Sequence, residues 1–124
     1  MSAKKTRVLV VEDEILVGIM LARKLEAFGY AVGEVIINGE EAVEVAGRQR
    51  PDVILMDIAL SGNLNGLEAA RQIRRRYNIP VIIFTGYDTE KLSREVGDIN
   101  PVAVVSKLDT IEEVLRAIAK AVGA

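Results

Sequence analysis

Short runs of branched apolar residues recur along the chain, and longer segments with helical periodicity separate them. Four of these runs are rich in Val and Ile, and they cover residues 7–11, 52–56, 80–84 and 102–105. Such runs are typical of parallel strands that are covered on both faces. A fifth, weaker run at residues 30–36 is expected nearer an edge of the sheet. Strands that alternate with helices predict an α/β fold, a three-layer sandwich with right-handed crossovers.

The segments between these runs carry the apolar stripes of amphipathic helices. The stripe of the last helix is the clearest, and the helix after residue 87 has the weakest one, with Leu92 and Val96 as its main apolar anchors. The predicted buried stripe of the first helix consists of Ile15, Ile19, Ala22 and Leu25.

The composition excludes several kinds of chemistry. The 124 residues suit one domain, 1–124, and contain neither Cys nor His. A disulfide, a Ser-His-Asp triad and a histidine-ligated metal are therefore excluded. The net charge of −2 does not indicate a nucleic-acid surface. No apolar run is long enough to span a bilayer and no signal-peptide core is present, so we expect a cytoplasmic protein without a membrane partner.

Polar residues follow the predicted strands at the points where the strands end. In chain order of the five predicted strands, Glu12 and Asp13 follow the first, Asp57 the third, Thr85 the fourth, and Ser106 and Lys107 the fifth. Each alone could be a helix cap, a turn residue or a solvated lysine. Because the carboxyl ends of parallel strands share one edge, where ligands bind in open α/β sheets, the joint pattern favours a site.

These residue types fit the chemistry of phosphoryl transfer. Crowded carboxylates repel one another and need a cation. Oxygen ligands without His or Cys favour Mg²⁺, with Mn²⁺ as a second candidate. A carboxylate at such a site can be a nucleophile that forms an aspartyl phosphate. The metal and a lysine would neutralise the phosphoryl oxygens, and a threonine hydroxyl could donate to the new phosphate.

With these residues in this order, the sequence resembles the receiver domains of two-component response regulators, from Arg7 to about Val122. The resemblance implies a five-stranded parallel sheet in the flavodoxin-like order 2-1-3-4-5 with five helices. It implies that Asp57 accepts a phosphoryl group from a histidine kinase or a phosphotransfer protein. The domain would then be a signalling switch rather than an enzyme, although it would catalyse its own phosphorylation and slow dephosphorylation.

The resemblance also assigns roles to individual residues. The implied metal ligands are Glu12, Asp13, Asp57 and the backbone carbonyl of Ala59. Lys107 would contact Asp57 and then the phosphate. The implied switch residues are Thr85, Gly86 and Tyr87. Phosphorylation is then expected to change the face formed by the fourth helix, the fifth strand and the fifth helix.

Several positions depart from the usual receiver pattern. Glu12 stands where most receivers have Asp, and Leu108 follows Lys107 in place of proline, so we expect a trans bond there. The loop at residues 58–66 lacks the usual Met-Pro, is one residue longer and is expected to be mobile. Val104 stands where an aromatic switch residue is usual.

Three other functions were weighed against this prediction. A magnesium-dependent phosphohydrolase would need a second acid two residues after Asp57, where Ala59 stands. A nucleotide-binding domain would need a glycine-rich loop after the first strand. The serious rival is a receiver-like interaction module that is not phosphorylated. The sequence shows no output domain and no direct nucleic-acid contact, whereas a downstream protein target and a homodimer are both compatible with it.

Overall fold

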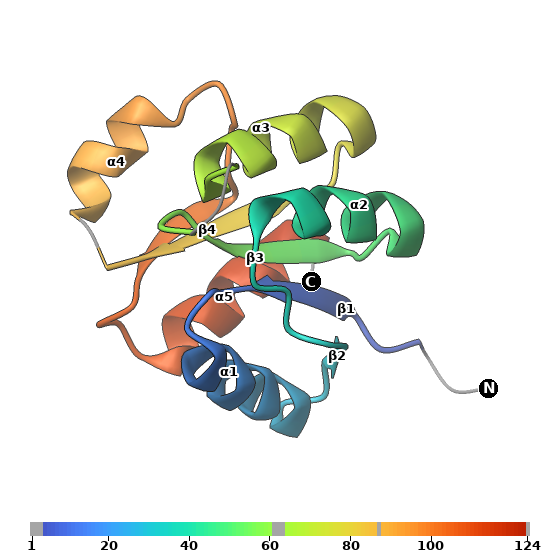
Figure 1. The fold of residues 1–124 in the computed structure, drawn as a ribbon. Helices are drawn as coiled ribbons and strands as arrows, with labels where there is room; N and C mark the ends of the chain where they lie inside the picture. The colour runs from blue at the N-terminus through green and yellow to red at the C-terminus, as the bar shows by residue number, and fades with distance from the viewer. Residues whose placement is uncertain (1–3, 61–63, 87, 124) are drawn as a thin grey trace.

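A parallel five-stranded sheet forms the centre of the molecule (Figure 1). The computed structural model describes residues 4–60, 64–86 and 88–123. Within these residues the strand order is β2-β1-β3-β4-β5, which confirms the predicted order. The strands are β1 (Arg7–Val11), β2 (Ala31–Val32), β3 (Val53–Asp57), β4 (Val81–Thr85) and β5 (Ala103–Ser106).

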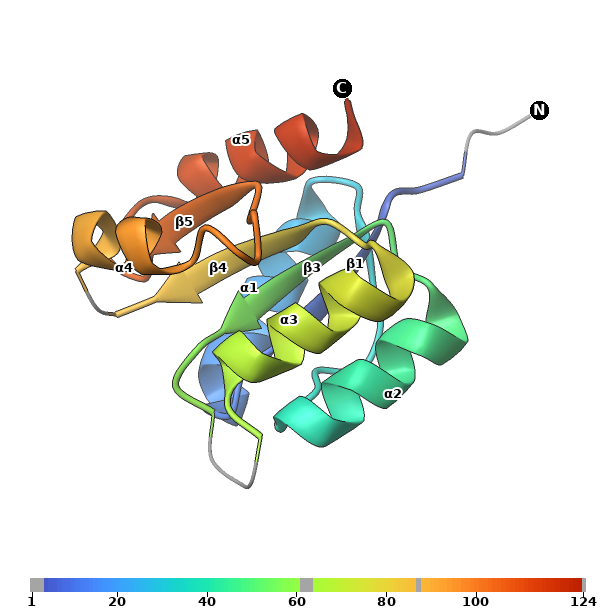
Figure 2. The same ribbon diagram turned by 90° about the horizontal axis from the view of Figure 1, so that it is seen from above.

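Helices cover both faces of the sheet and complete the three layers. Those of the described residues are α1 (Ile15–Ala27), α2 (Gly39–Gln49), α3 (Gly66–Tyr77), α4 (Thr89–Glu95) and α5 (Ile111–Val122). One face is covered by α2 and α3, with α4 beside them, and the other by α1 and α5 (Figures 1 and 2). None of these helices is long and apolar enough to cross a membrane.

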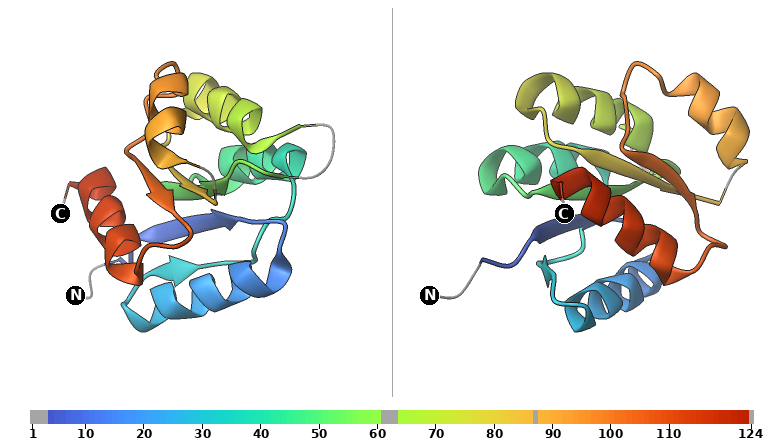
Figure 3. Two further views of the ribbon diagram at one scale, coloured as in Figure 1. Left: turned by 90° about the vertical axis from the view of Figure 1, so that its left-hand side faces the viewer. Right: turned by 180° about the vertical axis from the view of Figure 1, so that it is seen from behind.

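The burial of the strands follows their place in the sheet. Every residue of the central strands β3 and β4 is buried, because a helix layer covers each face. The edge strand β2 has only two residues, which pair with Arg7 and Val8 of β1. The chain rejoins β1 at a single bridge between Ile36 and Val11. The prediction of a weak strand in residues 30–36 near an edge of the sheet is therefore confirmed, and this strand lies beside α1 (Figure 3).

The predicted inner face of α1 is wrong in part. Ala22 and Leu25 are buried as expected, but Ile15 and Ile19 are 47% and 36% exposed. The helix instead packs through Gly18, which lies so close to the Val35 side chain that a β-carbon would overlap it. The first two turns of α1 are apolar on nearly all sides, so periodicity does not select one face.

The weak helix predicted after residue 87 is α4, and its apolar anchors are confirmed. Leu92 is buried within α4, and Val96 is buried at its C-terminal cap. Together with Ile99 they join the core that β3, β4, α2 and α3 form on the same side of the sheet. Most other side chains of α4 are exposed, so few contacts hold this helix in place.

Candidate functional site

The charged and polar residues predicted from the strand ends lie together at one edge of the sheet. Strand register places the ends level, since Val11 pairs with Met56, Asp57 with Phe84 and Thr85 with Ser106. Glu12 directly follows β1 and Lys107 directly follows β5. A parallel sheet thus brings residues that are 95 positions apart, Glu12 and Lys107, into contact.

Lys107 is the charged centre of this cluster. Its Nζ lies 3.3 Å from Asp57 Oδ2, 3.1 Å from Glu12 Oε1 and 2.9 Å from Glu12 Oε2. Glu14 Oε1 lies 3.7 Å away. The lysine is held in position by its own backbone, because its N–H donates to the Thr85 carbonyl at 2.7 Å. One amine therefore contacts acids from two strands, as phosphoryl-oxygen neutralisation requires.

The two acids that Lys107 contacts are buried. Glu12 is 1% exposed and Asp57 is 2% exposed. Burial and, to a smaller extent, the Asp57 charge raise the pKa of Glu12 to about 7, although the hydrogen bond from Lys107 lowers it. Burial lowers the pKa of Lys107, but its hydrogen bond to Glu12 and the charges of Asp57 and Glu12 outweigh this effect and raise it. The cluster therefore holds more negative charge than one lysine can neutralise.

The same acids fit a hard divalent cation. Glu12, Asp13 and Asp57 each offer a carboxylate oxygen, and these oxygens lie within 4.8 Å of one another. Among the described residues, Glu12 Oε2 is buried without a hydrogen-bond partner, although Lys107 Nζ is near it. An all-oxygen donor set without His or Cys suits Mg²⁺ or Mn²⁺.

A short turn after β3 fixes the Asp57 carboxylate. Asp57 Oδ1 accepts a hydrogen bond from the Ala59 N–H at 3.1 Å, while Oδ2 faces Lys107. Ala59, whose carbonyl is a metal ligand by the resemblance to receiver domains, is therefore part of the turn that orients Asp57. Its role as a ligand stays a prediction.

The predicted switch residues are described only in part. Thr85 is fully buried at the end of β4, next in the chain to Phe84, the register partner of Asp57. Gly86 is exposed directly after it. Tyr87 lies outside the described residues, as do residues 61–63 of the loop predicted to be mobile. The switch roles of Thr85 and Gly86 stay predictions.

The turn after β5 explains why proline is dispensable at Leu108. Leu108 donates its backbone N–H to Ser106 Oγ at 3.0 Å, a bond that proline cannot make. Asp109 closes the turn by accepting from the Ser106 N–H at 3.2 Å. No cis peptide bond occurs among the described residues, so the predicted trans bond is confirmed.

Two neighbours of the cluster were not assigned from the sequence. Glu14 approaches Lys107, and the Phe84 ring centre lies 5.8 Å from Lys107 Nζ, within range of a cation–π interaction. The sequence could have indicated them only by their position, since each is next in the chain to a predicted site residue. Adjacency alone does not tell which way a side chain points.

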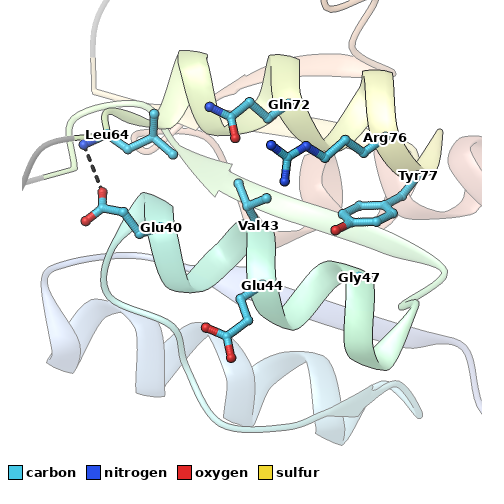
Figure 4. Close-up of a pocket in the computed structure, with 8 residues that line it drawn as sticks. All are labelled: Glu40, Val43, Glu44, Gly47, Leu64, Gln72, Arg76 and Tyr77. Carbon is cyan, nitrogen blue, oxygen red and sulfur yellow. Dashed lines mark hydrogen bonds between the residues drawn. The ribbon is translucent and has the colours of Figure 1, made fainter.

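A separate groove of about 670 Å³ lies between α2 and α3 (Figure 4). Its lining includes Glu40, Val43, Leu64, Arg76 and Tyr77, and none of the clustered acids or Lys107. The groove is therefore distinct from the charged cluster.

Comparisons with a protein family and with an individual protein both agree with the resemblance noted in the sequence. Residues 8–119 match the response regulator receiver domain family. Transcriptional regulatory protein PdtaR of Mycobacterium tuberculosis is 31% identical over 98% of this chain. The chain spans 58% of the length of that relative.

Solved structures agree with the fold. The signal receiver domain of a modulated diguanylate cyclase from Desulfovibrio desulfuricans is 35% identical, with a TM-score of 0.88 over 97% of this chain and 95% of that one. A response regulator from Burkholderia pseudomallei, solved with a phosphorylated aspartic acid and a calcium ion, is 28% identical. Its TM-score is 0.80, over 93% of this chain and 66% of that one.

Proposed function

This chain belongs to the response regulator receiver domain family, and from that premise we propose that Asp57 receives a phosphoryl group from a histidine kinase or a phosphotransfer protein. One observation carries the proposal: Lys107 contacts both buried acids, Glu12 and Asp57, at the carboxyl edge of the sheet. The phosphorylated aspartic acid of the Burkholderia pseudomallei structure supports the same chemistry in a similar protein.

The proposed phosphoryl transfer needs a nucleophile and positive charge to stabilise the phosphoryl oxygens. A carboxylate oxygen of Asp57 attacks the phosphorus of a phosphohistidine, the new P–O bond forms, and the P–N bond breaks. The imidazole leaves with the electron pair of that bond and takes a proton from solvent. Lys107, already 3.3 Å from Asp57, stabilises the negative phosphoryl oxygens. A divalent cation at Glu12, Asp13 and Asp57, with the Ala59 carbonyl as a further ligand, would supply the remaining positive charge.

Exposed apolar residues beside the cluster support α1 as the docking surface of the phosphodonor protein. Leu16 of α1 is 73% exposed and Leu108, directly after Lys107, is 92% exposed. A groove of about 190 Å³ between α1 and α5 is lined by Met20 and Phe84 and also by Lys107. Because this apolar surface adjoins the acceptor, a donor that covers it would bring its phosphohistidine to Asp57.

Intact mass measurement tests the acceptor directly. Incubation with acetyl phosphate and Mg²⁺ is expected to add one phosphoryl group, and Asp57→Asn is expected to abolish the addition. Asp52→Asn, at an exposed aspartate before β3, is the matched control and should label like the wild type. Undiminished labelling of Asp57→Asn would refute the assignment.

The same experiment distinguishes the unphosphorylated interaction module. That function predicts no added mass with acetyl phosphate or with a phosphorylated histidine donor. It also predicts that Asp57→Asn leaves partner binding unchanged. The proposed acceptor function predicts that phosphorylation changes the affinity for a downstream target.

A further inference from the structure

The loop between β3 and α3 is closed at its base by backbone contacts. The Ala59 N–H donates to Asp57 Oδ1, and the Gly66 N–H donates to the Ile58 carbonyl at 3.2 Å. A β-carbon at Gly66 would overlap the Asp57 carbonyl oxygen and lie 2.6 Å from Ile58 Cα. The start of α3 therefore sits directly against the backbone of the proposed phosphoacceptor.

Leu64, near the other end of this loop, is held by the first turn of α2. Glu40 Oε1 accepts a hydrogen bond from the Leu64 N–H at 2.8 Å (Figure 4). The Leu64 carbonyl lies so close to Gly39 that a β-carbon there would overlap it. Helix α2 thus fixes both backbone groups of Leu64, one by a charged hydrogen bond and the other by close packing.

The start of α2 is in turn connected to the first acid of the cluster. The Glu12 N–H donates to the Ile36 carbonyl at 2.8 Å, just before Asn38 caps α2. Through these bonds the segment that begins α2 contacts the chain beside Glu12 on one side and the β3–α3 loop on the other. A shift of Leu64 and the adjoining Gly66 relative to α2 would therefore move the Ile58 backbone relative to Glu12.

We infer that Glu40 is a positioning residue for the divalent-cation site, and that it acts by holding Leu64 and, through Gly66, the backbone of Ile58 next to Ala59. The inference rests on the proposed function, because it concerns the cation that would assist phosphorylation of Asp57. Without the bond from Leu64, the backbone beside Ala59 is held less firmly, and fixing it when the cation binds weakens binding. The hydrogen bond has a charged acceptor, which makes it one of the stronger kind.

Three variants separate the hydrogen bond from the charge of Glu40. Glu40→Ala removes both the bond and a carboxylate in the first turn of α2. Glu41→Ala removes a carboxylate from the same turn, which also interacts with the helix dipole, but leaves the Leu64 bond intact. Glu40→Gln removes the charge but keeps an oxygen that can accept from the Leu64 N–H.

Mg²⁺ affinity, measured by calorimetry, and amide exchange at Leu64 are the two readouts. We expect Glu40→Ala to bind Mg²⁺ about tenfold more weakly, at the lower end of the range for residues that orient metal ligands. Its Leu64 amide should also exchange faster than in the wild type. Glu41→Ala should stay close to the wild type, and Glu40→Gln should weaken binding less than Glu40→Ala, because it keeps the hydrogen bond with a neutral acceptor. A loss of folding stability alone would not produce this pattern, because each titration is made on folded protein.

Each result has a definite meaning. Wild-type affinity in Glu40→Ala would overturn the inference and leave the proposed function intact. Equal weakening in Glu41→Ala, or weakening in Glu40→Gln as large as in Glu40→Ala, would overturn it in favour of a charge effect. If the wild type neither binds Mg²⁺ nor takes up a phosphoryl group, the proposed function itself fails.

Discussion

The charged cluster and helix α4 lie on neighbouring parts of the sheet edge, yet they are held in opposite ways. Glu12, Asp57 and Thr85 are buried, and Lys107 contacts both acids. Helix α4 has seven residues, of which only Leu92 is buried. A groove of about 400 Å³ lies between α4 and the start of α3. One region is fixed by strand ends and ion pairs, and the other by little more than two apolar anchors.

This contrast assigns different tasks to the two regions. Phosphoryl transfer needs groups that already lie in position before the reaction. A conformational response needs an element whose displacement has a small free-energy cost, and sparsely buried helices are of that kind. We therefore expect changes at the cluster to alter chemistry and metal binding, and phosphorylation to alter α4.

The largest expected effect comes from Lys107. Lys107→Ala should slow phosphorylation by acetyl phosphate about 100-fold, because it removes a preorganised positive group from the transferring oxygens. A time course of intact mass measures this rate. Lys91→Ala, which removes a lysine from α4, is the matched control and should react at the wild-type rate. Equal rates in the two variants would show that Lys107 takes no part in the transfer.

Glu12 should make the metal-free fold less stable as pH rises. Its pKa is about 7 in the fold and 4.5 in the reference state, so between these values the unfolded chain loses a proton that the folded chain keeps. Glu12 leaves the free energy of unfolding unchanged below pH 4.5 and lowers it progressively as the pH rises toward 7. Above pH 7 the total reduction is about 3 kcal/mol. Glu12→Gln, which cannot ionise, should lack this loss.

Urea unfolding in EDTA at pH 5 and pH 8 measures the effect of Glu12. The stability difference between Glu12→Gln and the wild type should grow by about 3 kcal/mol between the two conditions. Glu14→Gln, at a well-exposed neighbour, should show almost no such change. A difference independent of pH would show that Glu12 is charged throughout this range. Saturating Mg²⁺ should reduce the effect, because a cation favours the ionised carboxylate.

Asp13 and Glu12 should contribute unequally to the affinity for Mg²⁺. Asp13→Ala is expected to weaken Mg²⁺ binding by at least about tenfold, because it removes a carboxylate from a site with few protein ligands. Glu12→Ala should weaken binding less, since Lys107 already neutralises part of the Glu12 charge. Calorimetric titration compares the two, and wild-type affinity in Asp13→Ala would exclude it as a ligand. Mg²⁺ should also raise the unfolding temperature of the wild type.

Helix α4 should respond when the cluster is phosphorylated. With a phosphoryl mimic bound at Asp57, amide exchange is expected to change most in α4, β5 and α5, because only Leu92 of the seven α4 residues is buried. Helix α2 is the internal reference, because five of its eleven residues are buried. Changes confined to α2 would contradict the assignment of α4 as the responding element.

The smallest expected effect concerns the lifetime of the phosphate. Ala59 has no group to hold the water that would attack the phosphoryl group. Ala59→Asn adds an amide that can orient such a water, so its phosphate should decay a few-fold faster than that of the wild type. Decay is followed after removal of the donor at constant Mg²⁺. Equal or slower decay would exclude this role for position 59.

Much of the fold and the gathering of the cluster could be predicted from the sequence. The runs that became β1, β3, β4 and β5 are dense in branched apolar residues, and each is followed by a polar residue of the cluster. Parallel pairing then requires those residues to meet. The face of α1 could not be predicted in the same way, because Ile15 and Ile19 are as apolar as Leu21 and Leu25.

The sequence by itself determined which residues end the strands and therefore which chemistry the edge can perform. It did so because β-propensity and apolar runs are local properties that neighbouring residues specify. The tertiary structure alone decided that Lys107 contacts Glu12 as well as Asp57, that α1 turns Gly18 inward, and that Glu40 binds the Leu64 backbone. These outcomes depend on distances between segments remote in the sequence, which are set only when helices and sheet pack together.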